Sequence, residues 1–199
     1  MHREFAGARF IATFKRRRKI PTQLTQELSL WCRRIWQSGL APASPSGFAG
    51  NISVRYSTGF IISVTGAEFS AMQNEDFTQV LATDIEERMI TVAGRSKPSS
   101  ESFLHDMVYR CRPEINAVIH GHDDLVLQHH TDMQLPVTAR EHPSGTLELT
   151  AEAIKVLNHN DYILLRNHGF LALGETQDMA GNLALRKHEV AAVWAEPAQ

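Results

Sequence analysis

The spacing of hydrophobic residues changes along the chain from helical to strand-like and back, and each change marks an expected element. Residues 22–38 carry apolar side chains three and four apart between Pro21 and Gly39, which is typical of a helix with one buried face. The expected buried stripe consists of Leu24, Leu28, Trp31 and Ile35. The first predicted element is therefore an amphipathic helix packed on the core.

A hairpin is expected after this helix. In residues 50–55 apolar and polar side chains alternate, which is typical of a strand with one buried face and places Ser53 and Arg55 on the other face. A turn at residues 57–59 leads into residues 60–64, which are mostly apolar and form the returning strand.

Strand-like and helical stretches continue to alternate through the rest of the chain. Further strands are expected at residues 77–82, 89–92, 115–119, 135–138, 162–165 and 170–173. Further helices are expected at residues 99–112, which Pro113 terminates, and at 123–128, 146–158 and 177–196. The last helix is expected to bury Leu183, Val190 and Trp194. Alternating elements that include hairpins predict a layered α/β domain with a mixed, largely antiparallel sheet.

The composition is that of an ordinary globular protein. With 199 residues, 43% hydrophobic and 21% charged, the chain suits a single domain at residues 21–199, preceded by a basic arm at residues 1–20. No apolar run approaches the ~20 residues of a membrane-spanning helix. Cys32 and Cys111 both fall on apolar faces of expected helices. We therefore expect buried free thiols and a reducing, cytoplasmic location.

The basic arm holds seven of the 20 Lys and Arg residues and one acidic residue, Glu4. Its run KRRRK at residues 15–19 could contact nucleic acid or an anionic surface. We favour a solvated arm, because no aromatic residues are interleaved to stack on bases. The arm lacks the apolar region of a secretory signal, although an Arg-rich start leaves an organellar transit peptide open. We therefore expect neither nucleic acid nor a membrane as a partner.

Residues with metal-binding chemistry gather in the second half of the chain, which holds nine of the ten histidines. His120 and His122 follow an apolar strand and, being two apart, would point to the same side of it. Glu101 and His168 are candidates to complete a zinc site, which takes two or three histidines plus a carboxylate or water. A His-x-His pair by itself also fits ordinary core or surface histidines.

Glycine and hydroxyl residues suggest a place for an anion. Gly50 and Asn51 open the hairpin and Thr65 and Gly66 close it, so both pairs fall at the same end. Glycines there let backbone N–H groups approach an anion, and the Asn and Thr side chains add donors. The first turn of the helix opened by Ser99 and Ser100 offers further N–H groups to a phosphate. Each pair alone is also ordinary turn or capping chemistry.

Five motifs in this order, GNISVR, VTG, KPSSE, AVIHGH and NHG, resemble those of the class II aldolase/adducin family, across residues 22–195. The nearest likeness is to the L-fuculose-phosphate and rhamnulose-phosphate aldolases and ribulose-phosphate 4-epimerase. The resemblance implies a three-layer α/β/α fold and a homotetramer with active sites between subunits. One departure is that no tyrosine lies between Tyr109 and Tyr162. In the aldolases this region supplies a tyrosine that helps to protonate the leaving aldehyde. Glu141 and His142 are candidate replacements.

The resemblance also implies residue roles and an activity. The family's zinc ligands fall on His120, His122 and His168, and its catalytic acid/base, which can also bind zinc, falls on Glu101. The family's phosphate-binding positions fall on Gly50, Asn51, Thr65, Gly66, Ser99 and Ser100. The implied activity is that of a zinc-dependent lyase, which cleaves a phosphorylated ketose to dihydroxyacetone phosphate and an aldehyde through a metal-stabilised enediolate.

Alternatives to this activity stay open. Relatives that epimerise, dehydrate or decarboxylate share the same centre, and another divalent transition metal could take the place of zinc. A non-catalytic, adducin-like interaction module would keep the fold, but the presence of Glu101 and all three histidines favours an enzyme. Asp106, Asp161 or backbone carbonyls are the candidates to orient the imidazoles.

Overall fold

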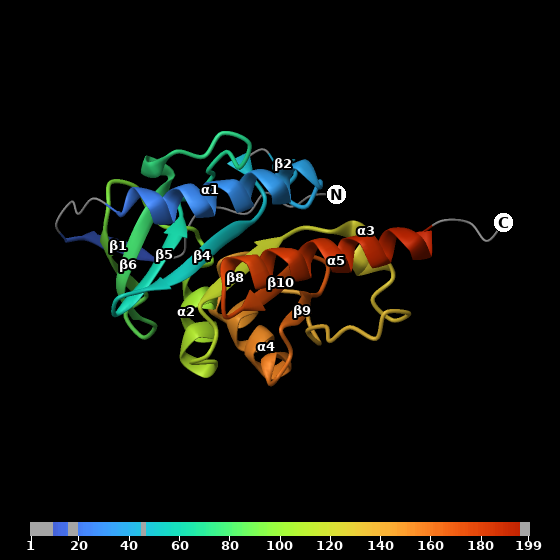
Figure 1. Ribbon diagram of the computed structural model, residues 1–199. Coiled ribbons are helices and arrows are strands. Elements are labelled where there is room, and N and C mark those ends of the chain that lie inside the picture. The colour runs from blue at the N-terminus through green and yellow to red at the C-terminus, as the bar shows by residue number, and fades with distance from the viewer. Residues whose placement is uncertain (1–9, 16–19, 45–46, 196–199) are drawn as a thin grey trace.

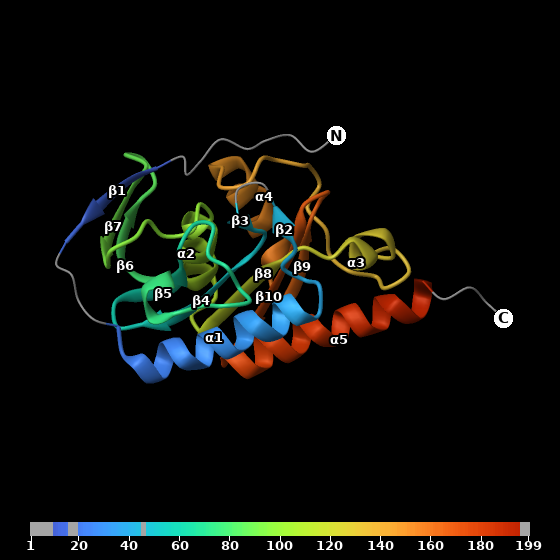
Figure 2. The same cartoon turned by 90° about the horizontal axis from the view of Figure 1, so that it is seen from above.

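The chain folds into three layers, with a sheet between two pairs of helices (Figure 1). The computed structural model describes residues 10–15, 20–44 and 47–195. Helices α1 (Thr22–Gln37) and α5 (Gln177–Ala195) lie side by side on one face of the sheet (Figure 2). Helices α2 (Ser102–Cys111) and α4 (Leu147–Leu157) contact each other on the opposite face. The expected three-layer α/β/α architecture is confirmed.

The central sheet has eight strands in the order β1-β7-β6-β5-β4-β8-β10-β9. Their bounds, in that order, are Ile11–Phe14, Met89–Ala93, Phe77–Asp84, Gly59–Ser63, Asn51–Tyr56, Ala117–Gly121, Gly169–Gly174 and Tyr162–Leu165. Strands β1 and β7 are parallel, and every other neighbouring pair is antiparallel, as expected for a mixed, largely antiparallel sheet. The short elements are β2 (Ala43–Ser44), β3 (Gly47–Phe48), the 3₁₀ helix η1 (Asn74–Asp76) and α3 (Asp124–Gln128).

Both faces of the inner strands are buried, because helices cover each face. In β8, Ala117 and Ile119 join the hydrophobic core under α1 and α5, whereas Val118 joins the core under α2 and α4. Two-sided burial explains why β8, β9 and β10 read as continuous apolar runs rather than as alternating patterns.

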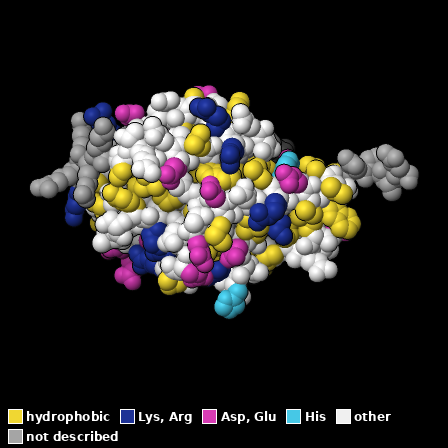
Figure 3. All heavy atoms as spheres, in the orientation of Figure 1, with side chains coloured by type: hydrophobic (Ala, Val, Ile, Leu, Met, Phe, Trp, Pro, Cys, Tyr) yellow, Lys and Arg dark blue, Asp and Glu magenta, His cyan; other side chains and the backbone are white. Residues whose placement is uncertain are grey.

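The packing of α5 differs from the expectation. Val190 and Trp194 are 47% and 53% exposed, so they do not form a buried stripe with Leu183. Small residues face the core instead, namely Ala180, Gly181, Ala184 and Ala191. A Cβ on Gly181 would lie 2.2 Å from the ring of Trp31, so glycine is what lets α1 approach this closely. Hydrophobic side chains gather on the surface over the end of α5 (Figure 3).

Two further expectations were wrong. Cys111 is exposed, while Cys32 is buried as expected. The side of α2 that follows Glu101 and carries His105 and Tyr109 packs against β4. Cys111, the last residue of the helix, therefore lies at the solvent edge. Residues 135–138 form no strand, and Val137 makes only an isolated bridge to Leu164.

Part of the basic arm belongs to the sheet. The segment Ile11–Phe14, expected to be solvated, pairs with β7 as an edge strand, although Ile11 and Phe14 remain exposed. Within the basic run, residues 16–19 lie outside the described residues, as do residues 1–9 and position 196 of the last predicted helix. Among the helices that the structure describes, none has the length and hydropathy to cross a membrane.

Candidate functional site

Neighbouring strands bring the candidate metal ligands to one end of the sheet. Strand β8 lies between β4 and β10, with Asn51 opposite His120 and Phe170 opposite Gly121. His120 and His122 therefore stand at the end of β8, while His168 lies in the turn between β9 and β10. This is the juxtaposition that His-x-His and the separate NHG motif predicted.

Two glycines make this approach possible. A Cβ on Gly121 would lie 2.6 Å from the carbonyl oxygen of Leu40, and one on Gly169 would lie 2.2 Å from the carbonyl oxygen of Gly121. Both distances are shorter than any real contact, so a larger residue at position 121 would push β8 away from Leu40, and one at position 169 would push β10 away from β8. Asn167 has a φ of 53°, a left-handed conformation that asparagine tolerates and that turns the chain into His168.

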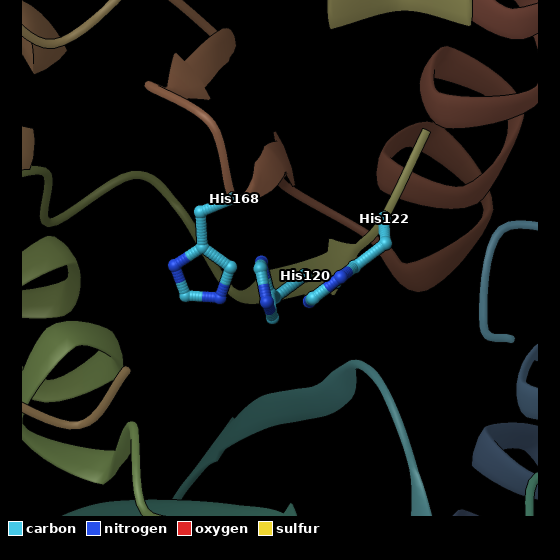
Figure 4. Close-up of side chains that lie close together, drawn as sticks. All are labelled: His120, His122 and His168. Carbon is cyan, nitrogen blue, oxygen red and sulfur yellow. The ribbon is translucent and has the colours of Figure 1, made fainter. Parts of the chain in front are cut away.

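The three imidazoles point toward a common centre (Figure 4). Their ring centroids are 4.9 to 5.1 Å apart in all three pairs, and one nitrogen from each ring lies within 4.8 Å of the others. His120 is buried, and His122 and His168 are half-buried.

Glu101 lies at the N-terminus of α2 and completes the cluster. One carboxylate oxygen, Oε2, lies 3.2 Å from His120 Nε2, and the other, Oε1, lies 3.5 Å from His168 Nε2. The Asn51 amide donates to Oε2 at 2.8 Å, and the Ser144 hydroxyl donates to Oε1 at 3.3 Å. The side chain is 2% exposed, so these partners fix its position away from water.

The hydrogen bonds of the cluster fit a bound cation. His120 Nδ1 lies 2.8 Å from the carbonyl oxygen of Phe170, which can only accept, so Nδ1 must carry the proton. In the neutral ring, Nε2 then presents a lone pair to the carboxylate of Glu101. Two lone pairs that face each other at this distance repel unless a positive charge lies between them. The donor set of three imidazoles and a carboxylate is one that zinc accepts.

The electrostatics keep His122 and His168 ready to bind a metal. Burial lowers the pKa of His122 to about 3, and the neighbouring imidazoles act in the same direction. Burial likewise lowers the pKa of His168 to about 4. For Glu101 burial alone would raise the pKa, but His120, His168 and the Asn51 amide bring it to about 2. Neutral imidazoles beside an ionised carboxylate are the protonation states that metal binding requires.

Two of the three pairs of residues expected to hold a phosphate lie on segments that meet. Val64 bridges to Pro98, and the Thr65 hydroxyl donates to the Pro98 carbonyl oxygen at 2.8 Å. This places exposed Thr65 and Gly66 beside the segment of Ser99 and Ser100.

Structural contacts also engage Gly50, Asn51 and Ser99 among the expected phosphate residues. Ser99 is buried, and its hydroxyl accepts from the N–H of Glu101 at 3.3 Å. Asn51 is buried and donates to Glu101, while Gly50 has a φ of 110° and lies against the carbonyl oxygen of His120. Asn51 therefore links the expected phosphate positions to the carboxylate.

Several contacts at the site could not be read from the sequence. Ser144 reaches Glu101 from a loop more than forty residues away. Asp106 binds Thr83, and Asp161 binds Arg112, so neither orients an imidazole; the Phe170 carbonyl does so for His120. No local signal distinguishes these residues, because their roles depend on which distant segments meet.

The site and fold match known proteins. The sequence pattern of the class II aldolase and adducin N-terminal domain matches residues 26–128, just over half of the chain. L-fuculose phosphate aldolase of Haemophilus influenzae is 30% identical over 190 residues, covering 86% of this chain and 82% of that protein. Methylthioribulose-1-phosphate dehydratase of an Enterobacter species is 40% identical over 92 residues, covering 46% of this chain and 41% of that protein.

A solved structure agrees in fold. L-fuculose-1-phosphate aldolase from Thermus thermophilus superposes with a TM-score of 0.70 at 26% identity, covering 89% of this chain and 99% of that one. The matched pattern includes Glu101, His120 and His122, and the similarity to the relative and to the solved structure extends over most of the chain. The chain therefore belongs to the class II aldolase and adducin family.

Proposed function

We propose that the protein is a zinc-dependent aldolase, a lyase that cleaves a phosphorylated ketose to dihydroxyacetone phosphate and an aldehyde. The observation that carries this proposal is the buried carboxylate of Glu101, held between His120 Nε2 and His168 Nε2. Similarity to L-fuculose phosphate aldolase over most of both chains supports the reaction type.

His120, His122 and His168 would hold the metal, with Glu101 as a further ligand in the resting enzyme. When bound, Zn²⁺ supplies a positive charge that stabilises the negative charge developing on substrate oxygens as the carbon–carbon bond breaks. Three neutral imidazoles leave that charge undiminished. Other divalent transition metals suit the same donors.

Glu101 is the residue that moves the proton. When the carbon–carbon bond breaks, the hydroxyl that becomes the aldehyde oxygen loses a proton and the carbon that becomes part of dihydroxyacetone phosphate gains one. The ionised carboxylate can accept the first proton and, as the carboxylic acid, deliver it to that carbon. Asn51 and Ser144 each hold one oxygen of Glu101, which limits the directions in which the carboxylate can act.

The phosphate of the substrate is assigned to the loops next to Glu101. The N–H of Thr65 donates to the Lys97 carbonyl oxygen at 3.3 Å, whereas the exposed backbone at Gly66 and the half-buried Ser100 offer N–H and hydroxyl donors to an anion. An anchored phosphate would align the reacting carbons with Glu101 and convert binding energy into orientation.

The test is hydrogen exchange into dihydroxyacetone phosphate in heavy water, followed by NMR with the zinc-loaded protein. We expect exchange at the hydroxymethyl carbon that is lost on chelation and in Glu101→Gln. The same substitution at an exposed position on α4, Glu148→Gln, serves as the matched control and should keep full activity. Exchange that persists in Glu101→Gln would remove Glu101 from the mechanism.

A second candidate is dehydration of a phosphorylated ketose. It is favoured by the 40% identity to methylthioribulose-1-phosphate dehydratase over 92 residues. Incubation with methylthioribulose 1-phosphate separates the two reactions, because an aldolase releases dihydroxyacetone phosphate whereas a dehydratase releases water and keeps the carbon chain intact.

We also propose a homotetramer acting on a small-molecule sugar phosphate in the cytoplasm. The exposed hydrophobic side chains of Val190, Val193 and Trp194 on α5 are consistent with association of copies. Sedimentation equilibrium measures the mass directly, and a monomer at micromolar concentration would contradict this assembly.

A further inference from the structure

A column of polar side chains runs behind Glu101, between β4 and α2, and the proposed reaction leaves most of it unused. Asn51, Ser53 and Arg55 are two apart on β4, so they point to the same face of the sheet. They meet, in order, three residues that are four apart, namely Glu101 at the N-terminal cap of α2 and His105 and Tyr109 on the helix.

The contacts form the successive rungs of a ladder. Asn51 donates to Glu101 at 2.8 Å. Ser53 Oγ lies 2.6 Å from His105 Nδ1 and 2.7 Å from the Tyr109 hydroxyl. Arg55 donates to the Tyr109 carbonyl oxygen at 3.0 Å, and its guanidinium carbon lies 4.8 Å from the centre of the Tyr109 ring.

The middle of the ladder is buried, which makes its polar groups costly unless they are paired. Ser53 and His105 are both 0% exposed. If Tyr109 donates to Ser53 and Ser53 donates to His105 Nδ1, each hydroxyl is satisfied. His105 Nε2 and Asn51 Oδ1 find no partner within the described part of the protein. A purely structural contact could be made by apolar residues at lower cost.

We propose that His105 is a positioning residue for Glu101. This inference rests on the proposed function, in which Glu101 moves the proton. Hydrogen bonds are directional, whereas apolar packing is not, so the Tyr109–Ser53–His105 chain fixes the rotation and height of α2 relative to β4. Glu101 lies one helical turn before His105, so the same chain sets where the carboxylate stands relative to His120.

The test compares His105→Leu with a matched control on the same helix. Val108 is also fully buried on α2 but outside the ladder, so Val108→Ala reports general loosening of the helix. We expect His105→Leu to lower the kcat of dihydroxyacetone phosphate exchange by about 10–100-fold, with KM changed less than about twofold. His105→Asn, whose amide can still accept from Ser53, should recover most of the rate. Equal kcat in His105→Leu and Val108→Ala would overturn the proposal.

A second readout does not depend on activity. The visible absorption spectrum of the Co²⁺-loaded protein reports the ligands around the metal. We expect the spectrum of His105→Leu to shift toward that of Glu101→Gln, while Val108→Ala keeps the wild-type spectrum. If the wild type shows no exchange but this shift occurs, the proposed reaction is wrong and the positioning role stands. A wild-type spectrum in His105→Leu contradicts the positioning role.

Discussion

His188 Nδ1 lies 2.9 Å from Asp123 Oδ2, which joins α5 to the residue that follows His122. The other oxygen of Asp123 accepts from the N–H of Val126 at 3.1 Å and caps α3. Asp123 is almost fully buried. It directly follows His122, which is a candidate metal ligand. The pair therefore ties the end of β8 to a helix that lies much later in the sequence.

Loss of this tie should weaken metal binding. We expect His188→Ala to lower the affinity for Zn²⁺ by about 10–100-fold, because residues that hold a ligand's segment act in this range. Competition with a chromogenic chelator measures the affinity. His159→Ala, at an exposed position, is the control and should bind zinc like the wild type. Unchanged affinity in His188→Ala would show that the loop is fixed without α5.

Removal of a proposed metal ligand should weaken zinc binding more than loss of the contact between His188 and Asp123. We expect His168→Ala to lower zinc affinity by more than His188→Ala does, and by at least about 100-fold. The zinc content after dialysis against a weak chelator checks this directly. His130→Ala provides a control from a histidine outside the cluster. Full zinc occupancy in His168→Ala would mean that His168 is not a ligand.

The metal-free fold should lose stability as the pH falls. Burial lowers the pKa of His105 to about 3 from its ordinary value near 6.5, so between these values the unfolded chain binds a proton that the folded chain excludes. This contribution to stability is complete above pH 6.5 and declines toward pH 3. His122 and His168 act in the same direction, and the lowered pKa of Glu101 adds a loss below about pH 4.5.

Urea unfolding at pH 7 and pH 5 in the presence of a chelator measures this loss. For His105 alone we expect about 2 kcal/mol less stability at pH 5. His105→Gln, which cannot titrate, should flatten the dependence by a comparable amount. If the unfolding free energy changes equally between pH 7 and pH 5 in the variant and the wild type, His105 has the same pKa in the folded and unfolded chains.

The packing of α5 on α1 should depend on Gly181. We expect Gly181→Val to lower the free energy of unfolding by about 1–3 kcal/mol, because its side chain would overlap the ring of Trp31. Asn182→Val, at an exposed neighbouring position, is the matched control for helix propensity. Similar stabilities for the two variants would indicate that the helices separate without cost.

Sequence patterns predicted the elements and the candidate ligands because both depend on short-range spacing. Helical repeats located α1, and apolar runs located β9 and β10, within one or two residues at each end. The His-Gly-His pair signalled two side chains on the same side of one strand. The NHG motif after another apolar run pointed to His168 as a candidate third ligand, and the resemblance to a family implied the same role.

Tertiary structure alone decided which faces are buried and which distant groups meet. Ser53 alternates with apolar residues and was expected on the open face, yet α2 covers it, because burial depends on what packs above a strand rather than on the strand's own pattern. Trp194 was expected inside and is exposed, because small residues let α5 approach α1 along a different face. Ser144 on Glu101 and His188 on Asp123 depend on contacts between segments far apart in the chain, which no local spacing encodes.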